Sequence, residues 1–477
     1  MSAIGEGADT RTASSLEDAE ARLSRDGHRE RRRPIGLRRI VQGDDVLWAL
    51  PALVAEFASP GPVLVLADPV PMERDGVDLK EHVVSLLADA GARLVTLGTA
   101  GDEVHADMAT VDVARAALAG AGCVVSVGSG TLCDIGKKAT EGVGGTPPIP
   151  YLVVQTACSV NAFSDDMAVL LLHGAKRTLP SRWPDALVID LGVIADAPAE
   201  LNQAGVGELT SMFTGPSDWR LADLAGLDPG YDDAVVGLFR DGGEELERVA
   251  AGVATGDHAA LAWLCDRMTL SGLALGVAGR TAPISGAEHA ISHLLDMAAI
   301  RTGDPIGYHG AQVGVASVVV AALWEDLLEG IDPQRLLDPP PDEEAARADI
   351  ERRFGVFDPS GETAAECWRL YQRKLGAWAA GRAARERLVA GWSGHVARLT
   401  EGLRPPEAIV ATLRAAGAPA RFRDLGVDAE TARWAVGGAH LLRDRFGVLD
   451  LADLAGRWGP ADVDRVLERA AAAGGGL

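Results

Sequence analysis

The segment CVVSVGSGTLCDIGK, residues 123–137, decides the fold of this chain. It opens with a short, continuous apolar run, 123–127, as expected of a buried parallel strand. The run leads straight into Gly128-Ser129-Gly130-Thr131, and a helix is predicted to begin near Asp134. A glycine-rich turn between a strand and a helix lets the backbone approach a phosphate, and the helix N-terminus adds partial positive charge. The same turn also occurs as a plain tight connection, and it is neither GxGxxG nor a P-loop.

Strands and helices alternate on both sides of this segment. Apolar runs predict strands at 62–67, 92–97, 151–155, 167–172 and 186–190, and helical spacing predicts helices at 79–90 and 110–119. This alternation is typical of a doubly wound α/β sheet, in which ligands bind at the carboxyl ends of strands. Polar residues follow several of these strands, namely Asp68, the turn 128–131, and Thr156 to Asn161. Lys176 and Arg177 form a local basic pair, for which a solvated loop is the simplest interpretation.

After Pro198 the alternation stops and the pattern becomes helical to the end of the chain. Helices are expected at 315–329, 343–354 and 362–398, followed by several short ones within 405–473. We therefore expect an arm over 1–37, an α/β domain over 38–198 and an all-α domain over 199–477.

Three histidines stand out in the helical half, within the stretch 279–315. His289 and His293 are four residues apart, so they share one face of a helix. His309 follows after a turn, at the expected start of the next helix. Two imidazoles from different helices and a carboxylate from elsewhere would make a three-ligand metal site with an open position. Taken singly, each histidine could equally be an ordinary surface or core residue.

Composition excludes several classes of partner. The formal net charge of −23 argues against nucleic acid or an anionic membrane as the main partner. No apolar run is judged long enough to cross a bilayer. The five scattered cysteines form no CxxC pair and indicate reduced thiols in the cytoplasm. Residues 1–33 are polar and charged, without an apolar signal sequence, and predict a disordered arm.

Several ordered motifs resemble the sn-glycerol-1-phosphate dehydrogenase family, from about Arg38 to the end of the chain. They are GSGTLCDIGK (128–137), TACS (156–159), GAKRTLPSRWPDALVIDL (174–191), AGVGELTSMFTGPSDWRLADLAG (204–226), SGAEHAISH (285–293) and YHGAQVGV (308–315). That family belongs to the superfamily of iron-containing alcohol dehydrogenases and dehydroquinate synthases. The resemblance implies a dehydroquinate synthase-like fold, in which 38–198 form a Rossmann-like NAD(P)-binding domain and 199–477 form an all-α metal-binding domain. It also implies an active site in the cleft between the two domains, and often a homo-oligomer.

The resemblance also implies roles for individual residues. The metal ligands carried over are Glu208, His289 and His309, with His293 and Asn161 at the substrate as catalytic residues. The cofactor-binding positions are Asp68, Gly128, Ser129, Gly130, Thr131, Asp134, Thr156, Ser159 and Asp165. The implied cofactors are NAD or NADP and one divalent metal; two histidines and a carboxylate suit zinc, iron, nickel or manganese. The acidic Asp68 mildly favours NAD, because it would repel a 2′-phosphate.

Three positions depart from the family pattern. The family has Asp where Glu208 and Asn161 stand, and Lys where Met212 stands. These changes leave the metal chemistry possible but alter the substrate pocket and remove a cation that could meet a phosphate. The expected function is therefore a metal-dependent NAD(P) oxidoreductase for a small alcohol and ketone, like dihydroxyacetone phosphate reduction but with changed specificity. A dehydroquinate-synthase-like cyclase and a non-catalytic NAD- or metabolite-binding homologue remain the alternatives.

Overall fold

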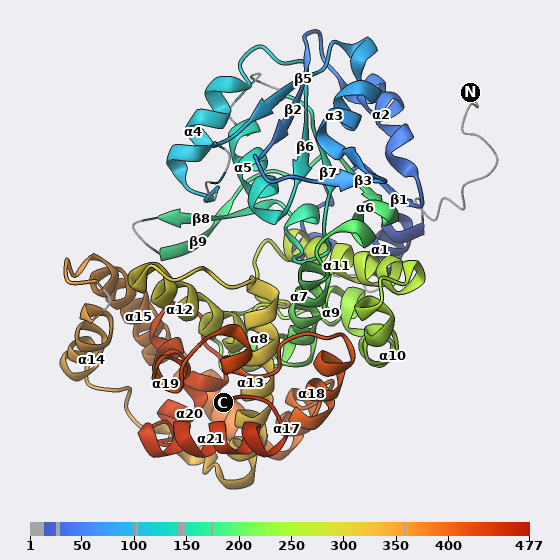
Figure 1. Cartoon of the computed structure of the whole chain (residues 1–477). Coiled ribbons are helices and arrows are strands. Elements are labelled where there is room, and N and C mark those ends of the chain that lie inside the picture. Colours follow the sequence, from blue (N-terminus) through green and yellow to red (C-terminus); the bar gives the residue numbers. More distant parts are fainter. Residues whose placement is uncertain are drawn as a thin grey trace. The chain divides into compact units, whose positions relative to one another are not determined.

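The chain forms two compact units, each built around its own core (Figure 1). The computed structural model describes residues 14–24, 29–99, 101, 104–141, 143, 145, 148–172, 175–356 and 358–477. The first unit comprises 1–172, 176–205 and 251–280, and the second comprises 173–175, 206–250 and 281–477. The sequence predicts a single cut at Pro198. In the structure the division instead falls inside α7 (Ala199–Thr210), and α11 (His258–Ala278) belongs to the first unit.

A six-stranded parallel sheet forms the centre of the first unit, in the order β1-β10-β7-β6-β2-β5. Its strands are β1 (Arg39–Gly43), β2 (Val63–Ala67), β5 (Arg93–Thr96), β6 (Cys123–Gly128), β7 (Tyr151–Gln155) and β10 (Ala186–Asp190). Five of them confirm strands expected from the sequence, and the edge strand β1 was not among the expected strands. The chain leaves β2 toward β5 on one side and returns to β6 on the other. This topological switch point lies between β2 and β6, where doubly wound sheets bind their ligands.

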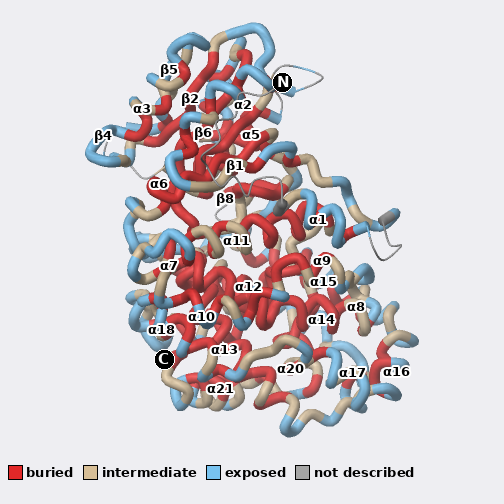
Figure 2. Tube along the Cα trace, turned by 90° about the vertical axis from the view of Figure 1, so that its right-hand side faces the viewer, coloured by how far each residue is buried: buried red, intermediate tan, exposed pale blue. Residues whose placement is uncertain are grey.

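Both faces of the sheet are covered, which explains the continuous apolar runs. On one face, Val65, Val125 and Val154 pack with residues of α2 (Leu50–Phe57) and α3 (Leu79–Leu86). On the other face, the Tyr151 hydroxyl donates to the carbonyl of Cys133 in α5 (Gly130–Thr140) at 3.2 Å. Figure 2 shows β2 and β6 as buried throughout. The helix after the glycine turn begins at Gly130, four residues before the predicted start.

Two small sheets and the remaining helices complete the first unit. The small sheets pair β3 (Glu73–Arg74) with β4 (Val77–Asp78), and β8 (Met167–Leu172) with β9 (Ala175–Pro180). The basic pair at 176–177 therefore lies on a strand, and its interpretation as a loop was wrong. The remaining helices that lie wholly in this unit are α1 (Ser14–Ser24), α4 (Met108–Ala117) and α6 (Leu191–Asp196), while α10 (Gly243–Ala254) spans both units.

Part of the N-terminal arm forms a helix in the structure. Helix α1 carries Leu16, Ala19 and Leu23 at helical spacing, and the last two are buried. These residues make an apolar stripe, and α1 contacts α11. Farther along, the backbone N–H of Arg33 donates to the carbonyl of Val277 at 2.8 Å. Residues 1–13 and 25–28 of the arm lie outside the described residues.

The described part of the second unit is built of helices around the long, buried α13. Its helices are α8 (Gly215–Leu224), α9 (Asp233–Arg240), α12 (Ala287–Thr302), α13 (His309–Gly330), α14 (Glu343–Gly355), α15 (Glu362–Ala380), α16 (Arg382–Ala390), α17 (Trp392–Leu399), α18 (Pro406–Ala415), α19 (Ala429–Gly438), α20 (Val448–Leu454) and α21 (Pro460–Ala472). Helix α13 contacts α12, α18 and α21. The helix expected over 362–398 is three helices, interrupted at Gly381 and Gly391.

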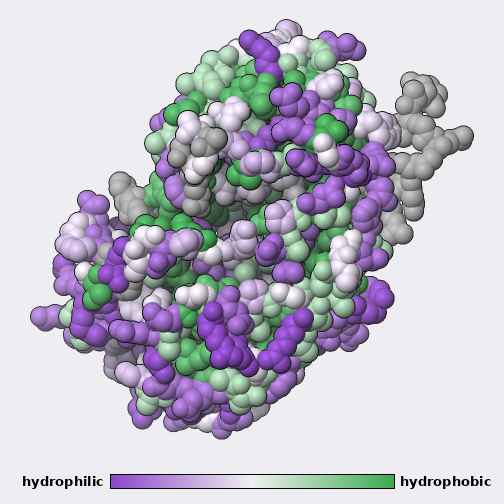
Figure 3. All heavy atoms as spheres, in the orientation of Figure 1, coloured by the Kyte–Doolittle hydropathy of each residue, from purple (hydrophilic) through white to green (hydrophobic). Residues whose placement is uncertain are grey.

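Helices α11 and α13 are long and apolar enough to span a membrane by length and composition, which corrects the expectation that no run would be. Most of each is buried inside the protein, 78% and 89% of the most apolar window respectively. Both therefore have the environment of core helices, and α12 and α13 lie in the buried interior of the second unit in Figure 2. The face seen in Figure 3 carries hydrophilic side chains in both units, with smaller apolar areas among them.

Candidate metal centre and cofactor-binding edge

Three helices of the second unit bring the predicted metal ligands together. Glu208 is near the end of α7, His289 is in the first turn of α12, and His309 is the first residue of α13. One ligand atom of each residue lies within 4.8 Å of the others. Glu208 and His289 are buried, and His309 is partly exposed. The triad thus leaves one open side, as a three-ligand catalytic site requires.

The distances fit a divalent ion. The Nε2 atom of His289 lies 3.3 Å from Oε1 of Glu208, and Nε2 of His309 lies 3.7 Å from Oε2. Ligand atoms about 2.1 Å from a tetrahedral zinc stand about 3.4 Å apart, and each imidazole lies near this separation from one of the two carboxylate oxygens. Glu208 Oε2 is buried and accepts no hydrogen bond from the described residues. An atom of this kind is costly to bury unless a cation completes its coordination.

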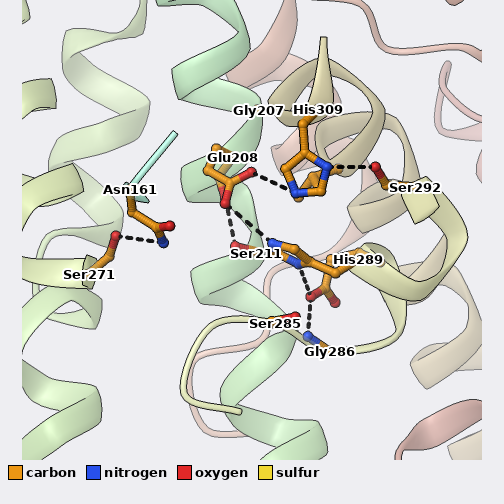
Figure 4. A network of polar contacts seen from close by, with 12 residues as sticks. Asn161, Gly207, Glu208, Ser211, Ser271, Ser285, Gly286, His289, Ser292 and His309 are labelled. Atoms are coloured by element: carbon orange, nitrogen blue, oxygen red, sulfur yellow. Dashed lines mark hydrogen bonds and ion pairs between the residues drawn. The ribbon is translucent and has the colours of Figure 1, made fainter. Parts of the chain in front are cut away.

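Each imidazole is also held on its other nitrogen, as Figure 4 shows. His289 Nδ1 lies 2.9 Å from Oε1 of Glu288, and His309 Nδ1 lies 3.0 Å from Oγ of Ser292. Such contacts fix the orientation of metal-ligating histidines. Sequence reasoning missed both partners. Glu288 adjoins its ligand in sequence, and Ser292 is three residues beyond it, so neither position carries a ligand-like spacing signal.

The charges of the triad are strongly coupled. Burial raises the pKa of Glu208, but His289 and His309 outweigh burial and hold this pKa below its usual value. Burial lowers the pKa of His289, whereas Glu208 and Glu288 raise it to about 9. The site is therefore an anionic pocket that favours a cation, either a proton on the imidazole or a metal ion.

The two predicted substrate residues lie on different units. His293 is one turn beyond His289 on α12, and its ring centroid lies 5.7 Å from that of His309. It therefore borders the triad. Asn161 belongs to the first unit, where its Nδ2 donates to Oγ of Ser271 on α11 at 3.2 Å. Met212, the departure from the family lysine, is buried in the short 3-10 helix Ser211–Phe213.

The predicted cofactor residues of the first unit line one edge of the sheet. In the strand register, Ala67 pairs with Val127, and Gly128 pairs with Gln155. Asp68, the turn 128–131 and Thr156 therefore leave three neighbouring strands at the same carboxyl edge, on both sides of the switch point. Thr156 and Ser159 are nearly buried there.

The glycine turn is closely packed. A Cβ on Gly128 would lie 2.5 Å from a methyl of Leu132, and one on Gly130 would lie 2.5 Å from Cγ2 of Val160. Ser129, at the N-cap of α5, forms no side-chain cap hydrogen bond. Free N–H groups at the start of a helix are suited to a phosphate.

Asp134 and Asp165, both predicted to bind cofactor, face an internal lysine. Lys137 Nζ lies 3.0 Å from Oδ1 of Asp134 and 2.6 Å from Oδ1 of Asp165. All three side chains are buried, and Lys137 also donates to the carbonyl of Ala162 at 2.7 Å. The structure therefore gives both carboxylates a structural partner, and the prediction that they contact the cofactor receives no support from this geometry.

Asp68 is also engaged. Its Oδ1 accepts from the N–H of Val70 at 3.0 Å and lies 3.4 Å from Nζ of Lys80, which also donates to the Asp68 carbonyl at 2.6 Å. The carboxylate thus shapes the turn after β2. Its neighbour Lys80 offsets part of the negative charge on which the expected preference for NAD depends.

Comparisons with known proteins agree with this architecture. The pattern of the iron-containing alcohol dehydrogenase family matches residues 41–198. The structure of a probable glycerol dehydrogenase from Sinorhizobium meliloti is similar over 93% of this chain and 99% of that chain, with a TM-score of 0.57 and 18% identity. A maleylacetate reductase from Agrobacterium tumefaciens is similar over 92% and 97%, with a TM-score of 0.54 and 17% identity. Fold and metal triad together define the class of iron-containing alcohol dehydrogenases.

Sequence relatives narrow the class to one family. The chain is 31% identical to a glycerol-1-phosphate dehydrogenase (NAD(P)+) of Haloquadratum walsbyi over 298 residues, which cover 61% of this chain and 80% of the relative. It is 26% identical to the enzyme of that name from Bacillus licheniformis over 418 residues, 87% of this chain and 88% of the relative. The chain belongs to the glycerol-1-phosphate dehydrogenase family.

Proposed function

We propose that this protein is a metal-dependent NAD(P) oxidoreductase that interconverts a small alcohol and its ketone. Dihydroxyacetone phosphate is the first substrate to test, because the family acts on its reduction product. The observation that carries the proposal is the convergence of Glu208, His289 and His309, in which the buried Glu208 Oε2 accepts no hydrogen bond from the described residues. The arrangement of Asp68, the glycine turn and Thr156 at the switch point supports a dinucleotide in the first unit.

The residues divide the chemistry between them. The triad of Glu208, His289 and His309 would hold a divalent ion, which would supply Lewis-acid polarisation of the substrate oxygen for hydride exchange with nicotinamide. Glu208 provides the anionic ligand, and the two imidazoles provide neutral ligands. His293 borders the triad and is assigned the transfer of the hydroxyl proton. The open side of the triad at His309 leaves room for the substrate oxygen.

The substrate pocket differs from the family pattern. Glu208 and Asn161 stand at positions of family aspartates, and Met212 stands at that of a lysine. The buried Met212 offers a substrate phosphate no positive charge. We therefore propose that activity on dihydroxyacetone phosphate is reduced relative to a related ketone. The five free, buried cysteines suit a reducing compartment, so we assign the protein to the cytoplasm.

The proposal is tested on protein purified without chelator. Bound metal is measured first, and oxidation of NADH and NADPH is then followed with dihydroxyacetone phosphate, dihydroxyacetone and other small ketones. His309→Ala should lose metal and lower turnover at least about a thousandfold, since metal stabilisation is worth several kcal/mol and each 1.4 kcal/mol is tenfold. His258→Ala is the matched control, because His258 is exposed and contacts Asp44 far from the triad in sequence. Wild-type protein without metal and without turnover on any ketone would refute the proposal.

A further inference from the structure

We propose that Glu288 is a positioning residue of the metal centre, which sets the tautomer of His289 and strengthens it as a ligand. The inference rests on the proposed metal-dependent function. Glu288 is fully buried in the first turn of α12, directly before the ligand. Its carboxylate accepts three hydrogen bonds from groups of the second unit, namely His289, Gly286 and Thr214.

The first contact sets the tautomer. Glu288 Oε1 accepts from His289 Nδ1 at 2.9 Å and also from the N–H of Gly286. The N–H of Gly286 donates to Oε1 and the hydroxyl of Thr214 donates to Oε2, so both oxygens of Glu288 act as acceptors. A carboxylate that accepts in this way requires the proton of His289 on Nδ1, so Nε2, which faces Glu208, is the nitrogen left to bind a metal. That is the tautomer a metal ligand needs.

The remaining contacts hold the carboxylate in place. Thr214, which precedes α8, donates its hydroxyl to Oε2 of Glu288 at 2.9 Å. Gly286 has no space for a side chain, because a Cβ there would lie 2.9 Å from Glu288 Oε2 and 2.9 Å from Asp218 Oδ2. The position of Glu288 at the N-terminus of α12 also favours its negative charge. The carboxylate is therefore fixed independently of the imidazole that it orients.

The Nδ1 atom of His309 is hydrogen-bonded to uncharged side chains. Comparison of the two histidines therefore separates the effect of a charged partner from that of a hydrogen bond. Ser292 Oγ donates to Oε1 of Gln312 at 2.7 Å, so it must accept from His309 Nδ1 at 3.0 Å. Both histidines thus present Nε2, but Nδ1 of His289 contacts a carboxylate, whereas Nδ1 of His309 contacts a hydroxyl. A carboxylate on Nδ1 makes the imidazole more basic and a better metal ligand. Loss of the Glu288 charge should therefore weaken metal binding more than loss of the Ser292 hydroxyl.

The test compares Glu288→Gln, Glu288→Ala and Ser292→Ala with the wild type. The glutamine is isosteric: its oxygen can accept from His289 and Gly286, and its amide can donate to the Thr214 hydroxyl. Zinc affinity of the metal-free full-length chain is measured by competition with a chelator, and the visible spectrum of the cobalt-substituted protein reports ligand geometry. We expect affinity to fall about tenfold in Glu288→Gln and about a hundredfold in Glu288→Ala. The Ser292→Ala variant should change less than Glu288→Gln.

A matched control separates positioning from general destabilisation. Asp326 on α13 is another buried carboxylate of the second unit, paired with Arg457 and Arg465. Asp326→Asn should lower thermal stability and leave zinc affinity unchanged. If Glu288→Ala does not fold, the zinc affinity of the isosteric Glu288→Gln variant tests the inference. The inference would be overturned if Glu288→Gln bound zinc within twofold of the wild-type affinity and had an unchanged cobalt spectrum. A wild-type chain that binds no zinc would instead refute the proposed metal centre.

Discussion

Gly207 on α7 faces Gly310 on α13 so closely that a Cβ at 207 would lie 2.2 Å from the carbonyl oxygen of Gly310. Each glycine adjoins a ligand, since Glu208 follows one and His309 precedes the other. The absence of side chains lets the two helix backbones approach, which brings the carboxylate within reach of the imidazole. The metal centre therefore depends on small residues that cannot themselves bind metal.

Gly207→Ala should separate the two helices. A methyl group inserted into this contact should cost about 1–3 kcal/mol of unfolding free energy and lower zinc affinity. Thermal unfolding and chelator competition measure both effects. Gly376→Ala in α15 is the control, because nothing lies within 4 Å of a Cβ there and alanine favours a helix. Normal zinc affinity in Gly207→Ala would show that the close approach is not needed for ligand geometry.

Asp218 on α8 ties together two helices that are distant in sequence. Its Oδ2 accepts from the N–H of Ala287 at the start of α12 at 2.8 Å, and its Oδ1 accepts from the N–H of Val448 at the start of α20 at 2.9 Å. Asp218→Ala would leave two buried donors without partners, at about 1–3 kcal/mol each. We expect a loss of about 2–5 kcal/mol in unfolding free energy, measured by urea titration.

Asp232→Ala provides the comparison for this prediction. Asp232 also accepts from two N–H groups, those of Ala234 and Val235, but in its own helix and only partly buried. Water can replace it, so the cost should be about 1 kcal/mol. Equal losses in the two variants would contradict a special role for the connection between α12 and α20.

The sequence predicted those parts of the site that show a local pattern, such as helical spacing. It did not predict contacts between residues that are far apart in the sequence. His289 and His309 stand out because each occupies the start of a helix beside small residues. Glu288 could not be assigned, because consecutive residues on a helix point in different directions and only the backbone at the helix start turns it toward His289. The bond from Asp218 to Val448 spans 230 residues and leaves no local pattern.

The same limit applies to Asp165 in the first unit. The sheet order follows from alternating strands and helices, and the carboxyl-edge residues follow from the sheet. Asp165 was expected at the cofactor because of its position in the family pattern. No spacing rule links it to Lys137 in α5, and only the packed structure shows that this lysine occupies its carboxylate.

Asp165 should make stability depend on pH. Burial raises its pKa to about 7, with Lys137 opposing and Asp134 adding to the rise. The folded state therefore holds the proton more tightly than the unfolded state, whose pKa is near the usual value. The stabilising contribution is complete below about pH 4 and is lost as pH rises through about 7. Asn cannot lose a proton, so Asp165→Asn lacks this loss.

The stability of Asp165→Asn relative to wild type should thus improve by about 2–3 kcal/mol between pH 5 and pH 8. Urea unfolding at the two pH values measures the difference. Asp358→Asn is the control, because side-chain and backbone hydrogen bonds from Ser360 and Thr363 lower the pKa of Asp358 to about 2, well below this pH range. If the unfolding free energy of Asp165→Asn relative to wild type is the same at pH 5 and pH 8, Asp165 does not titrate between them.

Asn161→Asp tests whether this position sets the substrate. In the structure Ser271 donates its hydroxyl to the carbonyl of Met268 at 2.8 Å, so it accepts from Asn161 Nδ2. An aspartate would have no donor in Ser271 unless that hydroxyl turned, and its carboxylate would be available to substrate hydroxyl groups as in the family pattern. We expect the ratio of kcat/KM for dihydroxyacetone phosphate to that for dihydroxyacetone to rise about tenfold, equivalent to about 1.4 kcal/mol. Ser271→Ala, which removes the acceptor but keeps the amide, should leave this ratio within about twofold, since it introduces no charge. A fall of the ratio in Asn161→Asp would mean instead that the amide itself serves the phosphorylated substrate.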